Sequence, residues 1–147
     1  MRAFWNGEIS VKELVIVFFG NFVGILIIGG LGIFLASYPT LMENAANIMN
    51  ARMNLPFGVI LIRGIICGIC VQLAVDMWKK QKGSHPFFAM LPATAFVLLG
   101  CNHCIADMLY WLYSGNWGQI LQIFEAMGGN ITGAILFVIA NSGIQRH

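Results

Sequence analysis

Long apolar runs separated by short polar segments dominate the chain. The runs lack the polar face at helical period that a soluble helix carries, and each is long enough for a membrane span of roughly 20 residues. The pattern therefore predicts an all-α membrane protein with about four spans in a single transmembrane domain. The expected spans are 14–36, 57–78, 86–113 and 120–140.

The third run, 86–113, is too long for one straight span and has no polar loop to divide it into two. It is interrupted by Gly100-Cys-Asn-His-Cys104, so we expect a discontinuous helix broken near 100–104. Non-helical backbone at membrane depth is tolerated only where it is buried in protein or lines a cavity. The break therefore favours a transport path, with His103 inside it.

The polar segments predict how the chain is oriented in the membrane. Residues 1–13 are read as an interfacial segment, and 38–56 as a polar connection outside the hydrocarbon. The turn at 79–85 holds the densest positive charge, and short basic loops stay cytoplasmic. Both termini are then expected to be cytoplasmic, with Arg52 outside.

The composition also indicates a membrane protein. Of 147 residues, 59% are hydrophobic and 10% charged, with mean hydropathy +0.79, against roughly 25% charged in soluble domains. A soluble helical bundle is therefore disfavoured. The net charge of +2 is small and scattered, so no nucleic-acid partner is expected. The first 13 residues lack the features of a removable signal peptide.

Four cysteines occur as Cys67-x-x-Cys70 and Cys101-x-x-Cys104, a spacing compatible with a four-thiolate metal site or a redox pair. Both pairs lie in apolar segments, where cysteine is a small, easily buried residue. We therefore expect no metal and no cofactor. A membrane thiol oxidoreductase remains an alternative.

A Gly-Asn-x-x-Gly motif occurs in the first and last spans, which run in opposite directions. Opposed copies of one motif are typical of an inverted-topology repeat, although glycine-rich motifs also recur by chance. Their small residues predict close helix packing. The residues are Gly20, Asn21 and Gly24 in one copy and Gly129, Asn130 and Gly133 in the other.

Together the motifs resemble the formate/nitrite transporter family over nearly the whole chain. The matching segments, in family order, are Gly20–Gly24, Arg52-Met-Asn-Leu-Pro-Phe57, Arg63-Gly-Ile-Ile-Cys67 with Leu73-Ala-Val75, Gly100-Cys-Asn-His-Cys-Ile-Ala-Asp-Met108, and Gly129-Asn-Ile-Thr-Gly-Ala134. The resemblance implies an aquaporin-like fold, a homopentamer with one pore per protomer, and transport of small monovalent anions such as formate or nitrite across the cell membrane. It does not imply an enzyme.

The resemblance also implies site residues. His103 corresponds to the central protonatable group, and Phe96 and Val71 to constriction positions. An anion entering an apolar constriction must have its charge neutralised, and a histidine that titrates near neutral pH can supply a proton. A histidine bonded to backbone freed by the helix break is the alternative. Arg52 on the outer side could raise the local anion concentration by electrostatic attraction, or, as a lone exposed charge, have no effect.

Departures from the family pattern affect the same region. Asn102 replaces a glutamate, Asp107 an asparagine, Gly68 an asparagine and Arg52 a lysine. The first two family helices have no counterpart in these 147 residues. A truncated or degenerate family member without an intact pore is therefore a further alternative.

Overall fold

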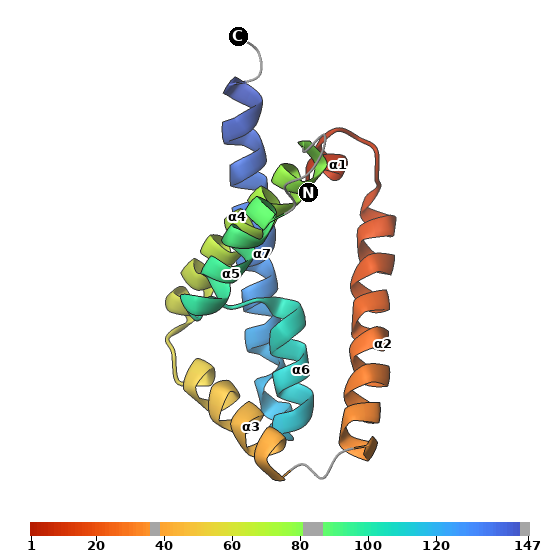
Figure 1. Cartoon of the computed structure of the whole chain (residues 1–147), viewed down its shortest axis with the longest axis vertical. Helices are drawn as coiled ribbons and strands as arrows, with labels where there is room; N and C mark the ends of the chain where they lie inside the picture. The colour runs from red at the N-terminus through yellow and green to blue at the C-terminus, as the bar shows by residue number, and fades with distance from the viewer. Residues whose placement is uncertain (36–38, 81–86, 145–147) are drawn as a thin grey trace.

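A computed structural model describes residues 1–35, 39–80 and 87–144, and its elements are all helical (Figure 1). In chain order they are α1 (Arg2–Trp5), α2 (Val11–Leu35), α3 (Pro39–Met53), α4 (Phe57–Lys80), α5 (Phe87–Leu98), α6 (Cys104–Ser114), the 3-10 turn η1 (Trp117–Gln119) and α7 (Ile120–Ile144). Residues 81–85 of the basic turn at 79–85, from which the orientation in the membrane is predicted, lie outside the described residues.

Three helices are long and apolar enough to cross a membrane, over Val11–Gly32, Phe57–Lys79 and Trp117–Ser142. The remaining apolar run is divided into α5 and α6, of 12 and 11 residues, each too short to span a bilayer alone. The backbone between them is non-helical at 99–103, which confirms the predicted broken helix. The chain is an all-α membrane protein.

Helices α4 and α7 pack closely through glycine faces. A Cβ atom added to Gly64 or Gly68 of α4 would collide with the backbone near Asn130 of α7. One added to Gly129 or Gly133 of α7 would collide with the backbone of α4. Small residues that let two backbones approach are the usual basis of helix association in membranes.

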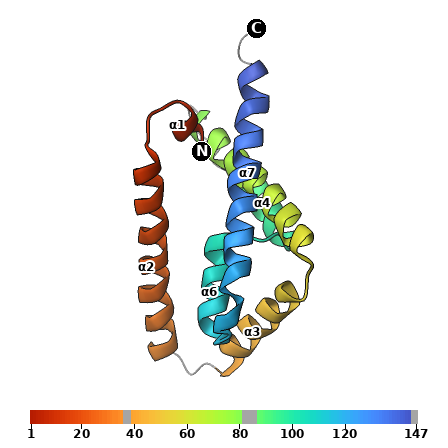
Figure 2. The same ribbon diagram turned by 180° about the vertical axis from the view of Figure 1, so that it is seen from behind.

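Helix α2 packs on side chains of α6 and does not make the close backbone contact seen between α4 and α7. Its Gly29 and Gly32 lie against side chains of α6, and Phe22 packs on a core that includes Met108 and Trp111. Its other glycines, Gly20, Gly24 and Gly30, have nothing within 4 Å of an added Cβ among the described residues. In both views α2 stands beside α6 and apart from α4 and α7 (Figures 1 and 2). The two Gly-Asn-x-x-Gly copies therefore differ in their packing: the copy in α7 contacts α4 through its glycines, and the copy in α2 makes no such contact among the described residues.

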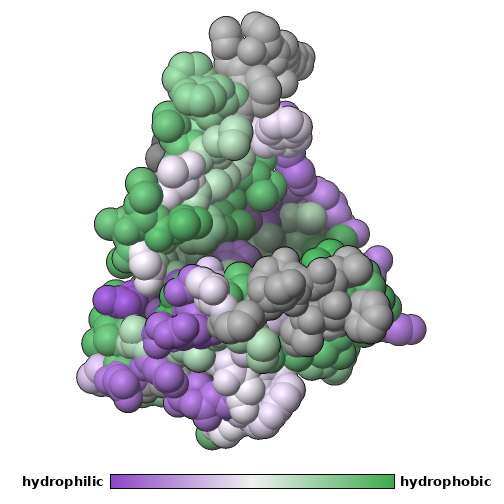
Figure 3. All heavy atoms as spheres, turned by 60° about the horizontal axis from the view of Figure 1, so that its bottom comes forward, coloured by the Kyte–Doolittle hydropathy of each residue, from purple (hydrophilic) through white to green (hydrophobic). Residues whose placement is uncertain are grey.

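The segment expected as a polar connection at 38–56 contains a 15-residue helix, α3, which the sequence interpretation missed. Ala45 and Met49, four residues apart, are buried on one face, and α3 lies against α6. Its other positions include Glu43 and several asparagines, and this polar majority hid the short apolar stripe. Figure 3 looks toward this end of the molecule, where hydrophilic atoms gather.

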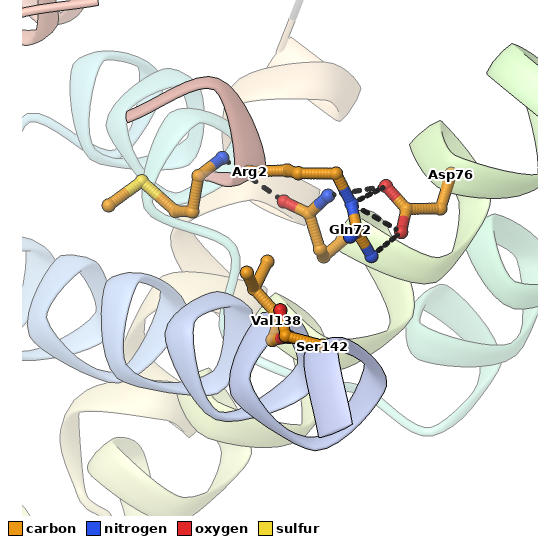
Figure 4. A network of polar contacts seen from close by, with 6 residues as sticks. Arg2, Gln72, Asp76, Val138 and Ser142 are labelled. Atoms are coloured by element: carbon orange, nitrogen blue, oxygen red, sulfur yellow. Dashed lines mark hydrogen bonds and ion pairs between the residues drawn. The ribbon is translucent and has the colours of Figure 1, made fainter. Parts of the chain in front are cut away.

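At the opposite end α1 is attached to α4 by an ion pair between the Arg2 guanidinium and the Asp76 carboxylate. Arg2 Nε also donates to Asp76 Oδ2 at 3.0 Å, and Gln72 Nε2 donates to Asp76 Oδ1 at 2.8 Å (Figure 4). Asp76 is buried near the end of a predicted span, where a carboxylate requires a partner. The sequence contains no local signal for a partner 74 residues away.

Candidate functional site at the helix break

The chain turns at the end of α5 and restarts as a capped helix. Gly100 has a φ of +62°, a left-handed conformation that glycine adopts without strain. His103 is extended and is the N-cap of α6, with its Nδ1 accepting a hydrogen bond from the backbone N–H of Ala106 at 3.2 Å. The cap satisfies one of the backbone donors that the first helical turn leaves free.

The side chain of Asn130 on α7 holds this break in place. Its Oδ1 accepts from the backbone N–H of Cys104 at 3.0 Å, and its Nδ2 donates to the carbonyl of Asn102 at 2.8 Å. Nδ2 also donates to the carbonyl of Gly64 on α4 at 2.9 Å. The predicted packing residue Asn130 therefore positions the site as well, because it ties the loop to two helices.

His103 lies between an aromatic ring and a cavity. Its imidazole stacks on Phe96 of α5, with ring centroids 5.5 Å apart and planes 18° from parallel. Because Nδ1 accepts a hydrogen bond, the proton of the neutral ring resides on Nε2. His103, Val71 and Asn130 line one cavity of about 300 Å³ that extends to Arg2 and Lys79.

The other side of the loop contains a buried polar cluster. Asn102 and Asp107 are each 3% exposed, and Asn102 Nδ2 donates to Asp107 Oδ2 at 3.2 Å. Asp107 Oδ1 forms an ion pair with Arg52 of α3, whose guanidinium also lies over the Tyr110 ring, 5.1 Å from its centroid. Burial lowers the pKa of Arg52, although arginine remains charged in proteins.

This geometry corrects the expectation that Arg52 is a lone exposed charge. A buried carboxylate is stable only when it is paired and hydrogen-bonded, and Arg52 supplies that pairing to Asp107. The surroundings of the pair are closely packed and leave no space for a water molecule. The residues around it are Met49, Arg52, Asn102, Asp107, Gln122 and Ile123.

The loop at 99–103 therefore has a cavity on one side and a closely packed polar cluster on the other. The cavity extends toward α1 and the end of α4, and the cluster lies toward α3, elements at opposite ends of Figure 1. Of the predicted pore residues, Val71 and His103 line the cavity, Phe96 stacks on His103, and Asn102 and Arg52 belong to the polar cluster.

The remaining predicted residues lie elsewhere or act differently. Asn21, in the α2 motif copy, is exposed and donates only within its own helix, to the Val17 carbonyl at 3.0 Å. The four cysteines are free thiols. Within 1–35, 39–80 and 87–144, no group of three or more His, Cys, Asp or Glu side chains is arranged to hold a metal ion.

Sequence interpretation did not anticipate that Asp107, Gln122 and Asn130 take part in the site. Asp107 stood out only as a departure from the family pattern, and Asn130 only as part of a packing motif. Gln122 has no signal of its own, since one glutamine near the start of an apolar helix is an ordinary interfacial residue.

Comparisons with known proteins identify the family of the chain. The chain is 27% identical to the "Uncharacterized transporter YrhG" of Bacillus subtilis (strain 168), over 92% of this chain and 57% of that protein. The chain thus spans a little over half the length of this curated relative. No solved structure matches it. The family described as "Formate/nitrite transporter" matches residues 3–142, and the chain belongs to that family.

Proposed function

We propose that this chain takes part in the transmembrane transport of small monovalent anions such as formate or nitrite, along a path that passes His103. The observation that carries the proposal is the position of this histidine. It caps a helix that begins in the middle of an apolar run, and it lines a cavity. A titratable ring at such a place is a functional-site hypothesis by default.

The mechanism follows from the two ring nitrogens. Nε2–H of the neutral ring donates a hydrogen bond to an anion in the cavity. When Nδ1 also takes up a proton, it gives up the hydrogen bond from the N–H of Ala106, and the imidazolium can transfer its Nε2 proton to the anion. The ring is then neutral with its proton on Nδ1, and the anion continues as a neutral acid. The neutral form avoids the cost of moving a bare charge past the apolar surfaces of Phe96 and Val71.

Orientation and assembly belong to the same proposal. We propose a cell-membrane protein with an aquaporin-like fold and both termini cytoplasmic, assembled as a homopentamer. Many apolar side chains of α2 and α5 are exposed, which suits contact with lipid or with neighbouring protomers. Native mass spectrometry in mild detergent should give five copies, and a monodisperse monomer would contradict the pentamer.

One observation favours the alternative of a family member without a sealed pore. Among the described residues, nothing packs against Gly20 or Gly24 of α2, whereas the corresponding glycines of α7 are in close contact with α4. No comparable observation favours the thiol oxidoreductase, because Cys67 and Cys101 are buried and all four cysteines are free thiols.

Flux measurements decide between transport and its alternatives. Protein reconstituted in liposomes should carry formate or nitrite above empty liposomes, with flux rising toward acid between about pH 8 and pH 5. His103→Asn should abolish that rise, because asparagine keeps an N-cap oxygen but does not titrate. His85→Asn is the matched control and should retain it.

The possible flux results distinguish the proposed transport function from its alternatives. Absence of wild-type flux over this pH range would contradict transport by this chain and support the family member without a pore. Flux with the same pH profile in His103→Asn would keep transport and remove the histidine mechanism. Loss of flux on replacing all four cysteines by serine would revive the thiol alternative.

A further inference from the structure

We propose that the cavity between the beginnings of α4 and α7 is a binding site for a primary ammonium group carried on an apolar body, with Glu125 as its counter-ion. The site is separate from the helix break, because neither His103 nor Asn102 lines this cavity. The inference goes beyond anion transport and does not depend on it.

The cavity has the size and the lining of a small-molecule site. Its volume is about 640 Å³, within the range of roughly 300–1,000 Å³ that ligand pockets occupy. Phe57 and Leu121 on its rim are 70% and 73% exposed, so the cavity opens at the surface of the described structure. The walls are mostly apolar side chains of the two helices and of the connection from α3 to α4 (Figure 1), namely Leu55, Phe57, Ile60, Leu61, Leu121 and Phe124.

Glu125 brings a carboxyl group to this apolar cavity. The residue is 9% exposed and lies within the span Trp117–Ser142. Its Oε1 accepts a hydrogen bond from the backbone N–H of Leu61 at 3.2 Å, so the carboxyl group faces α4. A carboxylate inside a membrane span requires a partner of opposite charge. Among the described residues no lysine, arginine or histidine lines the cavity or forms an ion pair with Glu125.

Gln122 adds a second acceptor. It precedes Glu125 by three residues, so the two side chains lie on one face of α7, and both line the cavity. Gln122 Oε1 is buried and has no hydrogen-bond partner in the part of the chain that the structure describes. Gln122 also borders the packed cluster around Arg52, but that guanidinium is already paired with Asp107. A buried acceptor without a donor is costly, so a ligand that brings N–H groups is favoured.

A primary ammonium group meets both requirements. It carries one positive charge for Glu125 and three N–H donors, enough for the carboxylate and for Gln122 Oε1. A proton on Glu125 would also remove the negative charge, but it would bring a single O–H donor and leave the cavity unfilled. A quaternary ammonium group carries the charge without an N–H. The apolar walls favour an alkyl or aryl body on the ligand.

Two sources carry this chemistry. One is a free alkylamine or arylamine. The other is the ethanolamine headgroup of a membrane phospholipid, whose acyl chains would lie against the exposed Phe57 and Leu121.

Three benzyl compounds test the free amine. Benzylamine, benzyl alcohol and benzyltrimethylammonium are titrated into the purified protein in a maltoside detergent at pH 7, and binding is measured by isothermal titration calorimetry. We expect benzylamine to bind saturably and at least about tenfold more tightly than either of the other two compounds. This comparison uses the wild-type protein and needs no variant.

Glu125→Gln keeps the shape of the side chain and an oxygen for the N–H of Leu61, and it should lower the affinity for benzylamine at least about tenfold. Glu43→Gln is the matched control, because it removes the same charge from an exposed residue of α3, and it should bind benzylamine like the wild-type protein.

A lipid arm identifies the source. Protein in nanodiscs with equal parts of phosphatidylethanolamine and phosphatidylcholine is released and analysed by native mass spectrometry. Retention of phosphatidylethanolamine over phosphatidylcholine by the wild-type protein, lost in Glu125→Gln, assigns the site to the lipid headgroup. Equal retention of the two lipids, together with benzylamine binding, assigns it to a free amine.

Equal affinities for benzylamine and benzyl alcohol would mean that Glu125 keeps its own proton, and they would overturn the inference. Benzylamine binding that survives Glu125→Gln, or that falls equally in Glu43→Gln, would overturn it too. The same conclusion follows if benzylamine does not bind and the two lipids are retained equally. None of these measurements requires anion flux, so a failure of the proposed transport function is recognised separately.

Discussion

The backbone N–H of Cys104 donates a hydrogen bond of 3.0 Å to Oδ1 of Asn130, which joins the first residue of α6 to α7. The same side chain donates to the carbonyls of Asn102 and Gly64. One asparagine thus satisfies backbone groups that the helix break would otherwise leave free. Its counterpart in the other motif copy, Asn21, bonds only within α2.

Asn130→Ala should destabilise the protein strongly. It removes three hydrogen bonds and leaves backbone groups of the break unpaired, at about 1–3 kcal/mol for each group that stays dry, and less where water or lipid relaxes around it. We expect a clear fall of the unfolding midpoint in detergent, measured by circular dichroism.

Asn21→Ala is the matched control, because it removes the same side chain from the same motif with loss of a single local bond. Its midpoint should stay close to that of the wild-type protein. Equal losses in the two variants would mean that Asn130 has no special role in holding the break.

Gly133→Ala should also destabilise the protein, because the added Cβ would collide with the backbone of Ile65 on α4, which cannot rotate away as a side chain can. Gly20→Ala has open space around it and should be neutral or stabilising by up to about 1 kcal/mol through helix propensity. Thermal unfolding of both variants in the same detergent measures the difference.

Comparable damage from both substitutions would show that the Gly20 face is packed in the protein under test. The partner would then be a segment or copy that covers α2, and the motif copies would be used alike.

Apolar length and the short interruption made the broken helix predictable. Gly100 and His103 mark it in the sequence, since a left-handed turn and an N-cap are chemical requirements of ending one helix and starting another. The apolar stripe of α3 escaped notice because Ala45 and Met49 stand among asparagines.

Contacts between distant polar residues could not be predicted. The ion pair of Arg52 and Asp107 joins residues 55 apart, and that of Arg2 and Asp76 residues 74 apart. A buried carboxylate needs a partner, but several arginines and lysines in the sequence could serve. Only the packing of α3 on α6 and of α1 near α4 selects among them.

Orientation can be tested in a cysteine-free background. The basic turn should be cytoplasmic, so Gln81→Cys should react with a membrane-permeant reagent but resist an impermeant thiol reagent in intact cells. Glu43→Cys, at an exposed position of α3, is the control and should react with the impermeant reagent from outside. The reverse pattern would invert the proposed topology.

The N-cap role of His103 predicts a difference between two substitutions that both remove its titration. His103→Asn keeps an oxygen that can accept from the backbone N–H of Ala106, whereas His103→Ala leaves that donor without a cap, at a cost of about 1 kcal/mol. Both lose the stacking on Phe96. Chemical or thermal unfolding should therefore rank the wild-type protein first, His103→Asn second and His103→Ala last. If the alanine variant is as stable as the asparagine variant, the cap does not hold the start of α6.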